Sequence, residues 1–183
     1  MNDLDDARLE ITAKLFYRTI LTRVITPGLA ELPEEKLTYV QLACMRYAYL
    51  HPEPSVGEIA DGLNISDAAS AKLIDRLVKR FLLIREEDPD DRRVLKIKLT
   101  DKGLIILKSL RETESHNFTT IIRKMSPGSV NALEQGLAAF LSAALGKPEE
   151  IEEACLRCGW EHSLDCPGNI RYRELTGEDK RNV

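Results

Sequence analysis

Apolar residues change their spacing within the stretch from Ser55 to Thr100. In its first part they recur every three or four residues, which is typical of one face of a helix. Gly62-Leu63-Asn64 ends one such segment and Ser66 opens another, so two short helices joined by a tight polar turn are predicted. This pattern indicates a helix-turn-helix.

The spacing after the second helix becomes that of a β-hairpin. Leu82-Leu83-Ile84-Arg85 is a short apolar segment, and further along Leu95, Ile97 and Leu99 occupy alternate positions. A polar turn at residues 88–93 separates the two segments, so two paired strands are predicted. A charged hairpin after a helix-turn-helix is a wing. Together they predict a winged helix-turn-helix that reaches two neighbouring grooves of a DNA duplex.

Helical spacing also precedes this unit. Residues 4–25 carry apolar side chains at helical intervals, until Pro27-Gly28 ends or kinks the helix. Thr38 and Gln41 have the spacing of a capping box, which starts a further helix that ends before the next prolines. Cys44 within that helix is predicted to be a buried packing residue.

Two longer helices follow the wing, one capped by Thr100 and one started by Ser126-Pro127. Their apolar surface is larger than one winged domain can cover, which predicts a homodimer with two recognition helices about one DNA turn apart. The predicted fold class is mainly α with a small β-hairpin wing (α+β). We expect an N-terminal dimerisation helix at residues 1–36 and the winged helix-turn-helix at 37–103. C-terminal dimerisation helices are expected at 104–147, followed by a Cys/His-rich tail at 148–183.

The second helix of the helix-turn-helix has two faces. We expect its core face to consist of Ala69, Leu73, Ile74, Leu77 and Phe81. The opposite face supplies the predicted DNA contacts, at Ser66, Ala68, Ala71, Lys72 and Arg76. Lys72 and Arg76 are candidates for contacts with base edges or phosphates. The two alanines allow a close approach to a thymine methyl group, and the free backbone amides near Ser66 are suited to binding a phosphate. The alternative is that these side chains contact only solvent and not DNA. This alternative is favoured for Asp75, because Lys79 lies four residues further along the helix and can form an ion pair with it.

This arrangement resembles the multiple antibiotic resistance regulator (MarR) family of bacterial and archaeal transcription factors. The resemblance covers roughly residues 5–146 and rests on Leu37-Thr38 with Gln41, Ile59-Ala60, Leu63-Asn64-Ile65-Ser66, Arg76-Leu77, Asp88-Pro89 with Asp91-Arg92-Arg93, and Leu99-Thr100-Asp101-Lys102-Gly103. Phe81 departs from the family pattern, which usually has glycine between the recognition helix and the wing. Because an aromatic residue tolerates a positive φ poorly, a different helix end or wing angle is expected there.

The resemblance implies how the wing and the subunits act. Asp91 would hold Arg93 in a salt bridge, and Arg93 would enter the minor groove, whose negative potential suits a planar guanidinium. Arg92 and Lys96 are candidates for further phosphate contacts. The family also implies a homodimer, usually a repressor, that binds double-stranded DNA sequence-specifically at a pseudo-palindromic operator. A small-molecule effector would shift the equilibrium between DNA-competent and incompetent arrangements.

Composition limits the function classes. The chain has 183 residues with 43% apolar and 31% charged content, and no apolar run approaches the ~20 residues that span a bilayer. The N-terminus is acidic, unlike a signal peptide, so we expect a cytoplasmic protein without a membrane contact. With a net charge of -4, DNA binding requires positive groups concentrated near the recognition helix and wing. No glycine-rich phosphate loop, serine elbow or paired carboxylates suggest an enzyme.

The end of the chain gathers residue types that bind metals, at Cys155, Cys158, His162 and Cys166. This density in a cytosolic protein favours a metal over a disulfide. Thiolates and imidazole are zinc ligands, and Cys158 followed by Gly159 resembles a zinc knuckle, although the spacing is one residue short on each side of the histidine. Zinc is therefore the first hypothesis for a cofactor.

Three alternatives stay open for this cluster. Pro167 after the last cysteine is typical of iron-sulfur ligation, with His162, Asp165 or an exogenous group as fourth ligand. A reversible disulfide of Cys155 or Cys158 is the second alternative, and incidental cysteines are the third. If the tail is the active part, the function class changes to a metal or iron-sulfur module that uses the winged helix for protein association.

Overall fold

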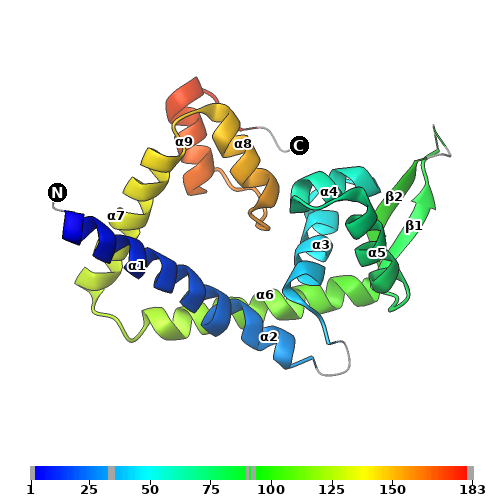
Figure 1. Ribbon diagram of the computed structural model, residues 1–183, viewed down its shortest axis with the longest axis horizontal. Coiled ribbons are helices and arrows are strands. Elements are labelled where there is room, and N and C mark those ends of the chain that lie inside the picture. The colour runs from blue at the N-terminus through cyan, green and yellow to red at the C-terminus, as the bar shows by residue number, and fades with distance from the viewer. Residues whose placement is uncertain (1–2, 33–35, 90, 92–93, 181–183) are drawn as a thin grey trace.

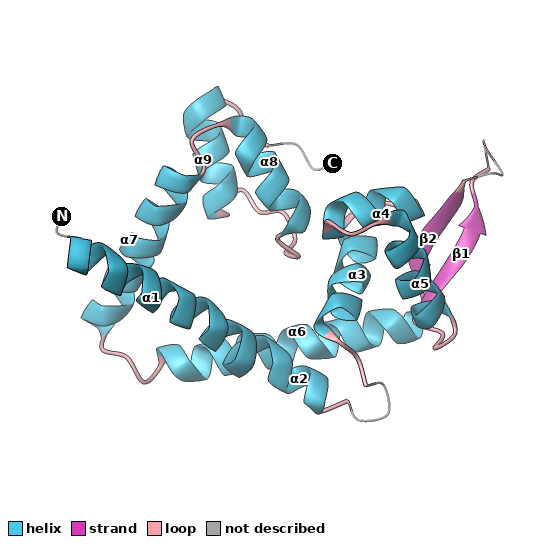
Figure 2. Cartoon of the chain, viewed as in Figure 1, coloured by secondary structure: helices cyan, strands magenta, loops and turns pink. Residues whose placement is uncertain are grey.

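The computed structural model describes residues 3–32, 36–89, 91 and 94–180, which are mainly helical with one two-stranded sheet (Figures 1 and 2). Their elements are α1 (Asp3–Thr19), a π-helical segment (Ile20–Ile25), α2 (Thr26–Ala30), α3 (Tyr39–Leu50), α4 (Val56–Leu63), α5 (Asp67–Val78), β1 (Leu83–Glu87), β2 (Leu95–Leu99), α6 (Asp101–Ile122), α7 (Pro127–Ala144), α8 (Pro148–Arg157) and α9 (Pro167–Thr176). The predicted fold class is confirmed.

The π-helical segment joins α1 to α2. Pro27 has no amide hydrogen, and its ring would collide with the carbonyl of Arg23 in a regular helix. The wider π-helical turn over Ile20–Ile25 lets the chain continue into α2, so Pro27 redirects the helix instead of ending it. A Cβ on Gly28 would lie 3.1 Å from Leu110 Cδ2, and the missing side chain therefore allows α2 to pack closely on α6.

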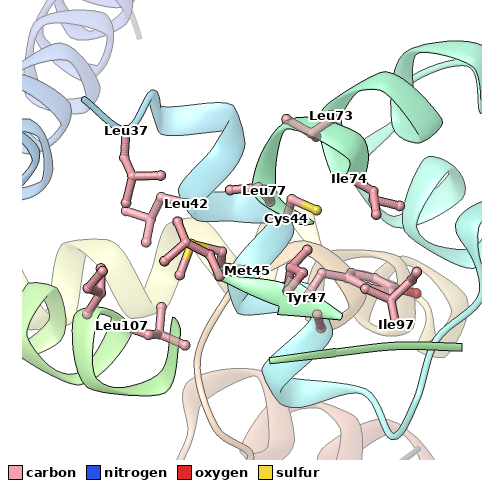
Figure 3. Close-up of a cluster of buried hydrophobic side chains, with 14 of the residues drawn as sticks. Leu37, Leu42, Cys44, Met45, Tyr47, Leu73, Ile74, Leu77, Ile97 and Leu107 are labelled. Carbon is pink, nitrogen blue, oxygen red and sulfur yellow. The ribbon is translucent and has the colours of Figure 1, made fainter. Parts of the chain in front are cut away.

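The hydrophobic core lies where α3, α4, α5 and the hairpin meet α6 (Figure 3). Its fully buried residues include Leu42, Met45, Ile59, Ile74, Leu77, Leu82, Leu83 and Ile97. The predicted burial of Cys44 is confirmed, and burial raises the pKa of its thiol to about 12, so the thiol stays protonated. The capping box is also confirmed: the Thr38 amide donates to Gln41 Oε1 at 2.9 Å, and the Gln41 amide donates to Thr38 Oγ1 at 3.3 Å.

The predicted helix-turn-helix consists of α4 and α5. Asn64 ends α4 in the left-handed conformation with a φ of 53°, and Ser66 caps α5 by accepting from the Ala69 amide at 3.3 Å. The predicted core face of α5 is wrong at Ala69, which is exposed. Ser70 is buried instead, because its hydroxyl donates to the Val56 carbonyl at 2.9 Å and its small side chain lets α5 approach α4.

Phe81 lies outside the core, contrary to the prediction, and its side chain is 75% exposed. The residue adopts the left-handed conformation, with a φ of 58°. Its amide donates to the Val78 carbonyl at 2.9 Å, and the Leu82 amide donates to the Leu77 carbonyl at 3.0 Å. This pair of bonds is a Schellman motif, so α5 ends here as it would with glycine. Leu82 takes the buried position that was expected for Phe81.

The wing is an antiparallel hairpin of β1 and β2, with Leu83 opposite Leu99. The first strand extends to Glu87, two residues beyond the predicted segment. Ile97 of β2 is buried, and its amide donates to the Pro54 carbonyl at 2.9 Å. The hairpin is therefore joined both to the core and to the start of α4.

The helices α6 and α7 start at the predicted caps: Thr100 Oγ1 accepts from the Gly103 amide at 3.0 Å, and Ser126 Oγ accepts from the Ser129 amide at 3.2 Å. No residue of α7 is buried in the described chain. The tail helices α8 and α9 lie between α7 and the α3–α4 pair (Figure 1), where Ile151 is fully buried. None of the described helices has the length and apolar character that a bilayer crossing requires.

Candidate nucleic-acid interface

The exposed face of α5 is cationic. Ala68, Lys72 and Arg76 follow one another at intervals of four residues, and all three are exposed. Within the described part of the chain, the side chains of Lys72 and Arg76 form no ion pair or hydrogen bond. The structure thus brings these three predicted contact residues together on one accessible surface.

Ser66 lies at the N-terminal end of the same helix. Its oxygen accepts the cap bond from the Ala69 amide, which leaves its hydroxyl hydrogen and the other first-turn amides available to a phosphate. Asp67 is exposed in the same turn, and its negative charge opposes a phosphate. The geometry therefore favours Lys72 and Arg76 over Ser66 as the principal anion contacts.

Arg85 of β1 fixes α5 to the wing. Its Nη1 lies 2.6 Å from Asp75 Oδ1, and its Nη2 donates to the Ala71 carbonyl at 3.4 Å. Ala71 is half-buried as a result, whereas we expected it on the open face. The predicted pair of Asp75 with Lys79 is wrong, because the wing returns beside α5 and presents the guanidinium of Arg85 to Asp75. One signal for this contact was left unused: the charged Arg85 directly follows the apolar residues 82–84.

Lysines at the base of the wing have carboxylate partners. Lys96 Nζ lies 3.5 Å from Asp88 Oδ2, and Lys98 Nζ lies 2.8 Å from Glu53 Oε1 and 2.7 Å from Glu86 Oε2. The hydrogen bonds to Glu53 and Glu86 raise the pKa of Lys98. Lys96, a predicted phosphate contact, is half-buried, so a phosphate would compete with Asp88 for it.

The predicted salt bridge between Asp91 and Arg93 belongs to the turn that joins the two strands of the wing. Asp91 is exposed, and its amide donates to Asp88 Oδ1 at 3.1 Å, which helps to form the turn. Arg92 and Arg93 lie outside the described residues. The salt bridge and the groove contacts of both arginines therefore stay predictions.

Known proteins are similar in sequence to the segment that forms this interface. The MarR family profile matches residues 37–95, from the segment before α3 to the start of β2. The HTH-type transcriptional repressor MdtR of Bacillus subtilis (strain 168) is 32% identical over 140 residues, which cover 76% of this chain and 87% of that protein. The chain belongs to the MarR family. An uncharacterized HTH-type transcriptional regulator of the same organism, YhbI, is 26% identical over 65% of this chain and 72% of its own length.

Solved MarR-family structures share the fold. A MarR family protein from Bacillus stearothermophilus has a TM-score of 0.66 and 21% identity, covering 80% of this chain and 99% of that one. A mutant of S. aureus MepR bound to an oligodeoxyribonucleotide has a TM-score of 0.53 and 20% identity, covering 72% of this chain and 96% of that one. At these identities the likeness establishes the winged helix-turn-helix fold.

Two cysteines in the tail of this MarR-family chain lie beside Gly168. A Cβ on Gly168 would lie 3.5 Å from Cys155 Sγ and 3.7 Å from Cys166 Sγ. The third, Cys158, accepts a hydrogen bond at its Sγ from the Trp160 amide at 3.4 Å. All three thiols are free, and burial is the largest cause of a raised pKa at Cys155.

The predicted four-ligand set is not assembled in the described residues, which contain no group of three or more His, Cys, Asp or Glu side chains placed to hold a metal ion. His162 is exposed on the loop between α8 and α9. A tetrahedral site with Cys155, Cys158 and Cys166 would require that loop to rearrange. The zinc and iron-sulfur hypotheses both stay predictions.

Proposed function

We propose that this chain is a homodimeric transcriptional repressor that acts in the cytoplasm by binding double-stranded DNA sequence-specifically at a pseudo-palindromic operator. The observation that carries the proposal is the face of α5 on which Lys72 and Arg76 are exposed and, among the described residues, unpaired. In a winged helix-turn-helix this helix enters the major groove, where such side chains reach guanine edges and phosphates. A net charge of -4 makes this local concentration of positive charge necessary.

Exposed apolar side chains on two helices support the homodimer. They are Leu9, Ile11, Leu15 and Tyr17 on α1 and Leu137, Phe140 and Leu141 on α7. Apolar surface of this extent is typical of an interface covered by another chain. A two-fold dimer through these helices would place its two α5 helices about 34 Å apart, one turn of DNA.

Fluorescence anisotropy with a duplex from the region upstream of the chain's own gene tests this proposal. Lys72→Ala and Arg76→Ala are each expected to weaken binding by about 1–3 kcal/mol and to reduce the preference over a scrambled duplex. Lys124→Ala, an exposed lysine after α6, is the control and is expected to leave that preference unchanged. Wild-type binding that is equal on both duplexes throughout a salt series would contradict sequence-specific binding.

A small-molecule effector is the first proposed input to the regulator. A cavity of about 170 Å³ between α3 and α6 supports this proposal, because it lies where the winged domain, residues 37–103, meets the long helix α6. A ligand that binds one arrangement of these two parts more tightly shifts the population toward it. Equilibrium dialysis against candidate compounds, followed by the anisotropy assay, tests whether binding changes operator affinity.

The metal or redox state of the tail is the second proposed input. We propose zinc as the metal, held by Cys155, Cys158, His162 and Cys166, with an iron-sulfur cluster or a thiol switch as alternatives. The Trp160 amide that donates to Cys158 Sγ supports a metal, because thiolate ligands commonly accept such bonds. Elemental analysis of protein purified without oxygen is expected to find about one metal centre per chain. Absence of both zinc and iron would exclude the metal and favour the thiol switch.

A further inference from the structure

The tail connects α7 with the winged domain. At one end α9 packs against α7, and Arg171 Nε donates to the Leu145 carbonyl at 3.2 Å. At the other end α8 packs against α4, and Leu156 contacts the core. Figure 1 shows α8 and α9 on the side of α3 and α4 opposite to the wing. The tail therefore contacts the winged domain without covering the wing.

The loop after α8 enters the junction between α3 and α6. Glu161 Oε1 accepts a hydrogen bond from Tyr49 Oη of α3 at 3.0 Å and from Arg111 Nη1 of α6 at 2.9 Å. The guanidinium of Arg111 also lies over the ring of Trp160, 5.3 Å from its centroid. A single carboxylate thus contacts both helices. We call residues 159–161 the clamp segment.

The clamp segment forms one wall of the cavity between α3 and α6. The rest of the lining carries three cationic side chains, from Arg46, Lys108 and Arg111. Gly159 adopts a φ of +73°, and a Cβ there would lie only 3.2 Å from Arg46 Cδ, so the loop approaches α3 more closely than a larger residue permits. Among these cations Arg111 pairs with Glu161 of the clamp segment, whereas Arg46 pairs with Glu114 of α6.

We propose that the clamp segment fixes the orientation of the winged domain on α6 and that its release weakens operator binding. This inference rests on the DNA-binding function proposed above and adds a means of regulating it. A domain that is already held in its binding orientation loses less freedom when it binds DNA. Because α3 belongs to the winged domain and α6 leads to α7, the contacts of Glu161 couple the tail to the placement of both recognition helices in the dimer.

Several weak contacts hold the clamp segment. The side chains of Arg111 and Glu161 are 41% and 52% exposed, and exposed ion pairs stabilise a protein little. The hydroxyl of Tyr49 and the ring of Trp160 add to this pair. The clamped arrangement is therefore close in free energy to a released one, and a single charge reversal is expected to open it. Because Glu161 lies outside the buried core, the fold should survive that reversal.

Glu161→Lys in the 183-residue chain tests the proposal. Glu149→Lys, on the exposed surface of α8, is the control with the same charge change. Trp160 is the only tryptophan of the chain, so its quenching by acrylamide reports on the clamp segment alone. We expect Glu161→Lys to increase this quenching and to raise the Kd for the operator duplex about fivefold relative to Glu149→Lys. Tyr49→Phe, which removes only one donor, should shift both readouts less and in the same direction.

Each other outcome overturns the inference at a different step. Unchanged Trp160 quenching in Glu161→Lys would show that the carboxylate does not hold the segment. If Glu161→Lys increases the quenching of Trp160 but has the same operator Kd as the control Glu149→Lys, the clamp segment has no influence on DNA binding. A wild-type chain without any preference for the operator would overturn the proposed function itself, and that failure is visible before any substitution is made.

Discussion

Arg46 of α3 forms an ion pair with Glu114 of α6, between Arg46 Nη2 and Glu114 Oε2. The two side chains are only 14% and 2% exposed. The pair joins the winged domain to α6 beneath the surface contact that Glu161 makes. Arg46 also lines the cavity next to it. A buried carboxylate depends on such a partner, because an uncompensated charge in the interior is costly.

Arg46→Ala is therefore expected to lower the free energy of unfolding by about 3 kcal/mol, since it leaves the Glu114 charge buried without its partner. Urea denaturation followed by circular dichroism measures this change. Arg123→Ala, an exposed arginine at the end of α6, is the control and should change the unfolding free energy by less than about 0.5 kcal/mol. If the two variants lose similar amounts of unfolding free energy, the ion pair between Arg46 and Glu114 makes no specific contribution to stability.

The pH dependence of unfolding tests Glu114 separately. Burial raises the pKa of its carboxyl above the ordinary 4.5, and the charge and hydrogen bond of Arg46 oppose that rise only in part. The folded chain thus holds this proton more tightly than the unfolded chain does. The contribution of Glu114 to the free energy of unfolding is therefore fully present below its ordinary pKa. It is lost as the pH rises through the raised pKa of the folded chain. Relative to Glu114→Gln, the wild type should lose stability as the pH rises above the ordinary carboxyl pKa of 4.5. A parallel pH profile for the two proteins would contradict the raised pKa.

Local sequence signals predicted much of the fold. Thr38, Ser66, Thr100 and Ser126 each cap the helix that they were expected to start, because a cap depends on residues three positions apart. The burial of Cys44 followed from its apolar surroundings. The wing followed from alternation over a few residues. These features require no knowledge of the tertiary arrangement.

Contacts between distant segments were not predictable. Arg85 meets Asp75 only because the wing returns beside α5, and Glu161 meets Arg111 only because the tail folds back onto α6. Helical periodicity also failed at Ser70, where a hydrogen bond to a neighbouring helix makes a polar side chain the buried one. Ala68, Lys72 and Arg76 were placed correctly on the exposed face of α5, whereas Ala71 is half-buried because Arg85 of the wing contacts it.

Phe81→Gly is expected to raise the free energy of unfolding by about 0.5–1 kcal/mol. A residue with a Cβ is strained at the φ of 58° that the chain adopts here, whereas glycine is not, and the exposed ring contributes little packing. Phe81→Ala keeps the Cβ and should bring no such gain. The midpoints of urea unfolding of both variants measure the difference. A loss of stability in Phe81→Gly would mean that the aromatic ring makes a stabilising contact.

Arg85→Ala is expected to loosen α5 relative to the wing and weaken operator binding. The variant removes both the ion pair with Asp75 and the bond to the Ala71 carbonyl. A double-mutant cycle with Asp75→Ala isolates the ion pair, whose coupling should be no more than about 1 kcal/mol because Asp75 is partly exposed. Operator affinity that is unchanged in Arg85→Ala would show that the α5–wing connection does not position the recognition helix.

Gly62→Ala should be among the most damaging single-methyl changes in the winged domain. A Cβ at this position would lie 2.0 Å from Tyr47 Cε2, and the Tyr47 ring cannot move away easily because it stacks on His51 at 4.1 Å between centroids. Overpacking of this kind costs about 1–3 kcal/mol or more. Gly128→Ala is the matched control, because nothing lies within 4 Å of a Cβ built there. Thermal unfolding compares the stabilities of the two variants.

A double variant tests whether the contact with Tyr47 causes the loss of stability in Gly62→Ala. If it does, adding Tyr47→Leu should recover part of the lost stability, and the absence of any recovery would place the cause elsewhere.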